Sequence, residues 1–299
     1  MTVTARGTGR DAARATPAKK RRWLAEVGWK YPVAALVAFY ALFPLVYVVS
    51  ASLNPRGSLA SSSALFSAVD FSNYAALSGT SYWTWVGNTL LVGGVASVGA
   101  VLMGAAGAYA FSRFRFSGRR ASLTGLLIVQ MFPQALAFVA IFLMLLTIGE
   151  VVPALGINSK LALICVYLGG ALGANTFLMY GFFNTIPIEI DESAKIDGAT
   201  HAQIFWRLIM PLVTPILAVV ALLAFISAFG DYILARIILV SEDNWTLAVG
   251  MYQWVSNQLT SRWGLFAAGS VLASIPVLAL FLSLQRYIVG GLTQGSVKG

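Results

Sequence analysis

Six long windows without a charged residue constrain this chain more than any other feature of its sequence. Each window can hold a helix of about 20 apolar residues, the length that crosses the hydrocarbon core of a bilayer. A chain that is 58% hydrophobic and 10% charged cannot bury so much apolar surface in one soluble core. We therefore predict an all-α, polytopic membrane protein with six transmembrane helices, in the windows 31–55, 71–112, 121–149, 161–188, 208–230 and 263–285.

The lysines and arginines between the windows predict the orientation of the chain. Sixteen of the 20 lie before the first span or after the second, fourth and sixth spans, and four lie in the other connections. Because cytoplasmic loops carry the excess of positive residues, both termini are predicted to be cytoplasmic. The net charge of +9 then reflects membrane topology, so we expect contact with membrane lipid and no binding of nucleic acid.

Composition divides the chain into three segments. Residues 1–30 are basic and poor in large apolar side chains, which predicts a disordered cytoplasmic segment. Residues 31–289 form the membrane domain, and 290–299 form a cytoplasmic tail. A cleaved signal peptide is the alternative for the first window, although that window is longer than the apolar part of most signals. One Cys and one His favour neither a disulfide framework nor a metal cluster, so we expect no cofactor in this chain.

The membrane windows contain polar side chains but almost no ionisable ones. Carriers coupled to protons or sodium usually have intramembrane charges. The rival hypothesis, a stand-alone channel or secondary carrier, predicts such charges, and the windows lack them. The chain has no G-x-x-x-x-G-K-[ST] phosphate loop and no converging catalytic pair, so we do not expect an enzyme. Seven polar residues could line a solute path or join helices: Asn88, Thr89, Gln130, Gln134, Asn175, Thr176 and Ser227.

The connection 187–211 contains the charged stretch DESAKIDGATHAQIFWRLIMP. Pro187 and the acidic residues after it predict the start of a short helix, and Gly198 is a natural left-handed cap at its end. Thr200 and Gln203 have the spacing of a capping box, which predicts a second short helix. An apolar stripe follows at Phe205, Leu208 and Ile209. We predict a helix-Gly-helix elbow whose acidic character suits a protein partner, with a solvated loop as the alternative.

This connection resembles a loop found in permease subunits of bacterial ABC importers, E-A-A-x-x-x-G-x9-I-x-L-P. The matching positions are Glu192-Ser193-Ala194, Gly198 and Leu208-x-Met210-Pro211, with small departures at Ser193, Leu208 and Met210. The segments NWTLAVGMYQW, WGLFAAGSV and QRYIVGGLTQGSVKG are similar to the MalG-like, maltose/maltodextrin branch of carbohydrate importers. The resemblance covers nearly the whole chain after residue 30.

The resemblance implies a type-I transmembrane domain at 31–289 and a function. The chain would be a permease subunit that moves a maltodextrin-like oligosaccharide across the cytoplasmic (inner) membrane of a bacterium, with trehalose or another oligosaccharide as the alternative. Its partners would be a MalF-like second permease, a MalK-like ATPase dimer and an extracytoplasmic sugar-binding protein. ATP and Mg would be bound by the ATPase, so this chain would be a transport subunit and not an enzyme.

Three contact sites are implied by the same resemblance. Loop 187–211 would be a pair of coupling helices that contact the ATPase, with contacts at Glu192, Ser193, Ala194, Asp197, Gly198, Ala199, Phe205 and Pro211. The polar loop before the sixth span would contact the binding protein or be an ordinary interfacial loop, and its residues are Ser256, Asn257, Gln258, Leu259 and Thr260. The tail would contact the ATPase or be a frayed end, and its residues are Gly295, Ser296, Val297, Lys298 and Gly299. We assign no catalytic, metal-binding or substrate-binding residue.

Overall fold

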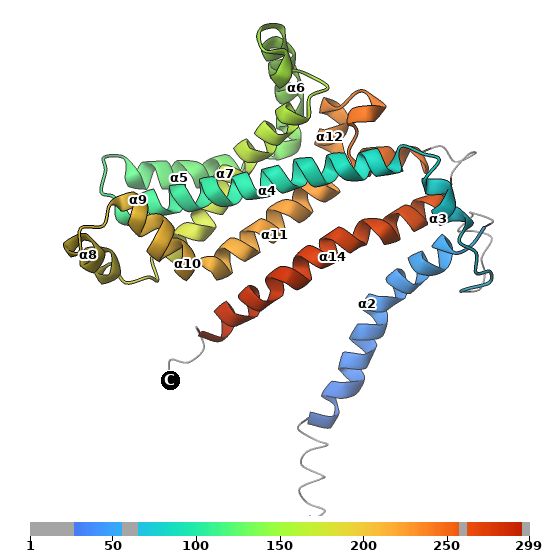
Figure 1. The fold of residues 1–299 in the computed structure, drawn as a ribbon, viewed down its shortest axis with the longest axis horizontal. Helices are drawn as coiled ribbons and strands as arrows, with labels where there is room; N and C mark the ends of the chain where they lie inside the picture. Colours follow the sequence, from blue (N-terminus) through green and yellow to red (C-terminus); the bar gives the residue numbers. More distant parts are fainter. Residues whose placement is uncertain (1–26, 56–64, 257–261, 295–299) are drawn as a thin grey trace, which may run out of the picture. The chain divides into compact units, whose positions relative to one another are not determined.

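The computed structural model describes residues 27–55, 65–256 and 262–294, which form helices and turns, with no strand among them (Figure 1). The chain forms two compact units, of which the first ends at Val49 and the second is Ser50–Gly299. Most of the described part of the first unit belongs to helix α2 (Lys30–Ser52). All contacts discussed below lie within the second unit.

The second unit contains long helices joined by short ones. The long helices are α4 (Tyr82–Arg113), α6 (Gln134–Val151), α7 (Lys160–Phe183), α11 (Thr214–Gly230) and α14 (Trp263–Gln294). The shorter α-helices are α3 (Ser72–Leu77), α5 (Arg119–Gln130), α8 (Glu189–Ile196), α9 (His201–Gln203), α10 (Met210–Leu212), α12 (Ile233–Ile238) and α13 (Leu247–Gln253). Two 3-10 turns, η2 (Pro153–Leu155) and η4 (Glu242–Asn244), and the π-helical segment η3 (Ile204–Ile209) complete this part of the chain.

Within the described residues, five helices are long and apolar enough to cross a membrane: α2, α4, α6, α7 and the part Trp263–Ile288 of α14. The segment His201–Leu212 together with α11 provides a sixth candidate, and these two parts meet at a bend of 80°. The prediction of an all-α membrane protein is confirmed, and the six expected spans are obtained when the bent pair counts as one. The orientation of the termini stays a prediction.

The third uncharged window, 121–149, holds two helices instead of the one expected. Helix α5 ends at Gln130 and α6 begins at Gln134, with Pro133 in the connection between them. Proline lacks a backbone N–H and disfavours a helical conformation in the residue before it. The helix therefore stops and restarts, and in Figure 1 α5 lies beside α7 while α6 leads away from it.

Small residues of α4 allow close packing against α7. An added Cβ at Gly99 would lie 2.5 Å from a methyl carbon of Leu168, and one at Gly107 would lie 2.9 Å from the Thr176 side chain. The side chains of α7 thus fill the space that the glycines leave. Thr176 is 1% exposed, so this polar residue takes part in helix packing.

Two polar residues near the start of α4 hold a connecting segment in place. The Asn88 side-chain amide donates hydrogen bonds to the carbonyl oxygens of Asp243 and Trp245, at 2.8 and 2.9 Å. Thr89 Oγ1 accepts a 2.6 Å hydrogen bond from the backbone N–H of Leu247. Since both side chains are buried, they join α4 to the segment before α13. The sequence left open whether Asn88 and Thr89 line a solute path or join helices. These contacts support the helix-joining role.

Candidate functional site

The connection between α7 and α11 forms the predicted elbow. Helix α8 ends at Ile196, and Gly198 adopts a left-handed conformation with φ of +83° before α9 begins. The backbone N–H of Ala199 donates to the Ala194 carbonyl at 2.9 Å, and that of Gly198 donates to the Lys195 carbonyl at 3.0 Å. These two bonds form a Schellman motif, which satisfies carbonyl groups at the helix end. The left-handed cap expected at Gly198 is confirmed.

The second half of the elbow begins with the predicted capping box. The Thr200 Oγ1 accepts from the Gln203 backbone N–H at 3.3 Å, and the Gln203 Oε1 accepts from the Thr200 backbone N–H at 2.8 Å. Together the two bonds satisfy donors that a helix start leaves unpaired. They start α9 at His201, so this local prediction is also confirmed.

The segment after α9 is π-helical, which changes which of its apolar side chains share one face. The Met210 N–H donates to the carbonyl of Phe205, five residues back, instead of the fourth as in an α-helix. With this wider period, Ile204 and Ile209 lie on one face, and both are 0% exposed. Leu208 is 36% exposed, so its place in the expected apolar stripe was wrong.

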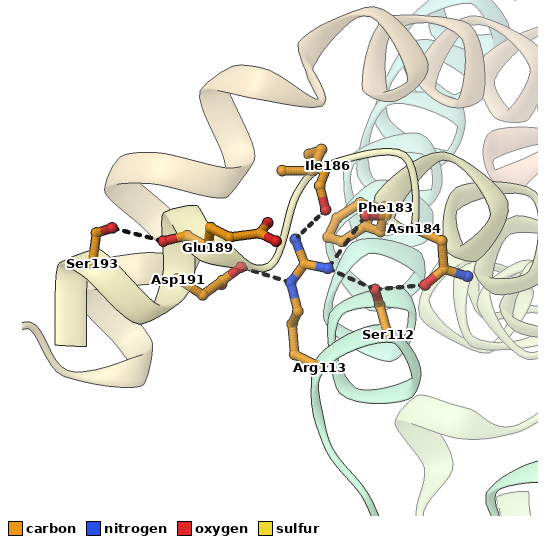
Figure 2. Close-up of polar contacts among 8 residues, drawn as sticks. All are labelled: Ser112, Arg113, Phe183, Asn184, Ile186, Glu189, Asp191 and Ser193. Atoms are coloured by element: carbon orange, nitrogen blue, oxygen red, sulfur yellow. Dashed lines mark hydrogen bonds and ion pairs between the residues drawn. The ribbon is translucent and has the colours of Figure 1, made fainter. Parts of the chain in front are cut away.

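A buried ion pair anchors α8 to the end of α4 (Figure 2). Arg113 Nε lies 2.8 Å from Asp191 Oδ2, and the two side chains are 7% and 3% exposed. Two opposite charges in a buried setting stabilise each other, whereas either alone would be left with a large desolvation cost. The pair therefore fixes α8 where the last turn of α4 ends.

The same arginine also binds the chain that leads out of α7. Its Nη2 donates to the carbonyl of Ile186 at 3.2 Å, and its Nη1 lies 3.5 Å from the Phe183 carbonyl and 3.2 Å from Ser112 Oγ. Figure 2 shows these contacts converging on one guanidinium group. Arg113 thus links three parts of the site: the end of α4, the end of α7 and helix α8.

Aromatic side chains anchor the other half of the elbow to α4. The ring centroids of Tyr109 and Phe205 are 5.1 Å apart, and those of Phe114 and His201 are also 5.1 Å apart. Such tilted and edge-on contacts add to the apolar burial of the rings. Both halves of the elbow are therefore attached to the C-terminal end of α4, so a movement of one would be transmitted to the other.

The opposite side of the elbow is exposed and carries both charges and large apolar groups. The Ile196 side chain is 86% exposed and Trp206 is 55% exposed, while Glu192 and Asp197 are also exposed. Exposed apolar groups surrounded by charged ones are typical of a surface that binds another protein.

The residues predicted to contact the ATPase divide between the two sides of this elbow. Ala194 is 9% exposed, and Ala199 and Phe205 are half-buried, so these three pack against α4 and α7. The remaining ones are exposed: Glu192, Ser193, Asp197, Gly198 and Pro211. The predicted contact set is therefore spatially mixed, because the motif contains residues that build the elbow as well as residues on its surface.

The two other predicted sites lie mostly outside the described residues. Ser256 is exposed, and its Oγ donates to the carbonyl of Gln253 at 3.2 Å. Positions 257–260 and 295–299 lie outside the described residues, so their assignments stay predictions.

Arg113 and Asp191 are the residues of the candidate site that sequence reasoning missed. Arg113 was interpreted as a topology charge and Asp191 as an anion at a helix start. The available signal was weak: Arg113 is the first charged residue after a long uncharged window, and Asp191 precedes the motif by one position.

The family "Binding-protein-dependent transport system inner membrane component" matches residues 96–294, which include α5 to α14 and most of α4. The chain belongs to this family. The permease is thus a transport subunit of an inner-membrane system and not an enzyme, as predicted.

Curated relatives match the permease over most of its length. It is 39% identical over 285 residues to the galactooligosaccharides transport system permease protein GanQ of Bacillus subtilis (strain 168), covering 94% of this chain and 98% of the relative. It is 37% identical over 274 residues to the maltose/maltodextrin transport system permease protein MalG of Escherichia coli (strain K12), covering 86% and 91%. The predicted membership of the MalG-like permeases is confirmed.

A solved structure shows the same fold. The permease matches a chain of a bacterial ABC transporter involved in the import of the acidic polysaccharide alginate, with a TM-score of 0.75 and 24% sequence identity, over 91% of this chain and 98% of that one. This likeness supports the arrangement of helices around the elbow.

Proposed function

We propose that the permease moves a neutral oligosaccharide through the cytoplasmic membrane as part of an ATP-driven importer. The observation that carries this proposal is the similarity over 94% of the chain to a galactooligosaccharide permease, together with maltodextrin permeases among the other relatives. Intramembrane charges of the kind that ion-coupled carriers use are nearly absent from its spans, which disfavours an ion-coupled carrier.

The elbow is the part of the permease that we assign to the ATPase. Its exposed side offers Ile196 and Trp206 for apolar contact, and Glu192 and Asp197 for polar contact. Its buried side is joined to α4 and α7 by Arg113, so a force on α8 would reach two spans. The ATPase dimer would bind ATP and Mg and drive this movement.

Two further partners complete the proposed importer: a MalF-like second permease and an extracytoplasmic binding protein that delivers the sugar. Ser256 lies just after helix α13, and Met251 and Trp254 of that region pack with Trp85 in the first turn of α4. Ser256 therefore lies at the opposite end of α4 from the elbow. We assign this end to the binding protein and the elbow end to the cytoplasm. The loop 256–260 and the tail 295–299 keep the contacts proposed from the resemblance.

The sugar can be identified from ATPase stimulation in the assembled importer. The complex, purified with its binding protein and placed in lipid discs, should hydrolyse ATP about tenfold faster with its cognate sugar, a typical magnitude for coupled sites. Maltodextrin, galactooligosaccharide and trehalose would be compared, with an amino acid as the control. Equal rates with every compound would contradict a sugar importer.

Cysteine labelling tests the proposed orientation. In a Cys165→Ala background, Ser256→Cys should react with an impermeant reagent in intact spheroplasts, whereas Ser117→Cys should react only after permeabilisation. Both serines are exposed, and a cysteine replaces either one with little change in volume. Gly250 in α13 would be a poor probe because an added Cβ there would overlap the Trp85 ring. Labelling of Ser117→Cys in intact spheroplasts would reverse the assigned topology.

A further inference from the structure

Three arginines line a surface hollow that lies outside the elbow. The hollow has a volume of about 350 Å³ and is lined by Arg115, Phe116, Gly118, Arg119, Arg120 and Ala121. It lies at the connection between α4 and α5.

The positive charge in this hollow is not neutralised by the described parts of the chain. Arg113, just before it, is paired with Asp191, whereas Arg115, Arg119 and Arg120 form no ion pair with a described carboxylate. Arg115 and Arg120 are exposed. Guanidinium groups bind phosphate oxygens through several donors at once, so the cluster fits an anionic, oxygen-rich ligand.

One of the three arginines is held in position by α7. The Nη2 of Arg119 donates a 3.0 Å hydrogen bond to the Tyr180 hydroxyl, and its guanidinium carbon lies 5.7 Å from the centre of the Tyr180 ring. Tyr180 packs against the apolar cluster beneath the elbow. The wall of the hollow is therefore built on the membrane core of the protein.

We propose that this hollow binds the phosphodiester head group of an anionic phospholipid. The hollow lies where the membrane span α4 ends, which is the depth at which lipid phosphates lie. Phe114 and Phe116, in the same connection, are 38% and 44% exposed, and aromatic rings are favoured at this interface. Helix α5 also begins at Arg119, so its N-terminal N–H groups favour an anion there.

Lipid binding can be measured directly on the full-length permease in the assembly in which it is purified from membranes. Native mass spectrometry would count bound dioctanoyl phosphatidylglycerol and, separately, bound dioctanoyl phosphatidylcholine. We expect the anionic lipid to bind at least tenfold more tightly. Removing two positive charges, in Arg115→Gln/Arg120→Gln, should weaken its binding by about thirtyfold, which corresponds to about 2 kcal/mol.

Matched variants separate this site from a general effect of charge. Arg236→Gln/Arg262→Gln removes the same charge at positions before and after helix α13, which packs against the start of α4, and should bind the anionic lipid like the unmodified protein. Arg115→Lys/Arg120→Lys keeps the charge and should retain most of the binding, which tests the proposal even if the glutamine variant fails to fold.

Four outcomes would overturn the proposal. Equal affinity for the two lipids would show that no anionic head group is selected. Unchanged binding by a folded Arg115→Gln/Arg120→Gln would place the lipid elsewhere. If inorganic phosphate alone bound as tightly as the anionic lipid, the hollow would be a site for a soluble anion. If a purified partner subunit displaced the lipid fully, the hollow would be a contact site for that protein.

Discussion

Replacing Asp191 with alanine should detach the elbow from α4 and destabilise the permease by about 3–5 kcal/mol, because Arg113 would be left buried without its counter-ion. Arg113→Met should have a similar effect and should also release the Ile186 carbonyl, to which Arg113 Nη2 donates at 3.2 Å. Both variants should show a lower melting temperature and faster proteolysis between α7 and α9. Sugar uptake should fall with them, since the ATPase contact would no longer be joined to the spans.

The double variant Arg113→Met/Asp191→Leu makes this prediction specific to the ion pair. Replacing both partners of a buried pair by apolar side chains is often nearly neutral, so the double variant should be more stable than either single one. Lys195→Met serves as the control for stability, because Lys195 is an exposed cation of the same helix and should change stability by less than about 0.5 kcal/mol. Melting of Asp191→Ala at the temperature of the unmodified protein would refute the anchoring role.

Gly198→Val should leave the permease at normal abundance in the membrane but reduce sugar uptake by tenfold or more. Nothing lies within 4 Å of a Cβ added at this position, so the substitution creates no clash with the rest of the fold. Its cost comes from the left-handed backbone, where a β-branched residue is disfavoured by about 1–2 kcal/mol. Relief of that strain would rotate α8 relative to α9 and displace the exposed groups on either side of the turn. Uptake and co-purification of the ATPase would both be measured.

Gly118 offers a closely matched control for Gly198. It has the same φ of +83° and also nothing within 4 Å of an added Cβ, but it lies in the connection between α4 and α5. Gly118→Val therefore imposes the same local strain outside the elbow and should transport faster than Gly198→Val. Gly198→Asn should retain more uptake than Gly198→Val, because asparagine tolerates the left-handed region. Equal uptake by the two valine variants would remove the coupling role assigned to this turn.

Two features that depend only on neighbouring residues were predicted correctly from the sequence. The left-handed Gly198 and the capping box of Thr200 and Gln203 are each made by atoms within a few positions of one another. The apolar windows also predicted membrane helices, since length and composition alone decide whether a segment can cross a bilayer. The break at Pro133 could have been predicted from proline chemistry, but the absence of charges across that window suggested one continuous helix.

The sequence by itself determined that this chain is a helical membrane protein with an elbow at 187–211, because composition and local hydrogen bonding require no knowledge of distant residues. The tertiary structure decided which groups build that elbow. Arg113 and Asp191 look like ordinary loop charges until the end of α4 meets α8 and buries both. Likewise, the π-helical turn buries Ile204 and Ile209 against α4 and α7 and exposes Leu208. Which of these side chains is buried depends on packing between helices. Burial is a property of the assembled fold, and here burial separates residues that build the site from residues that face a partner.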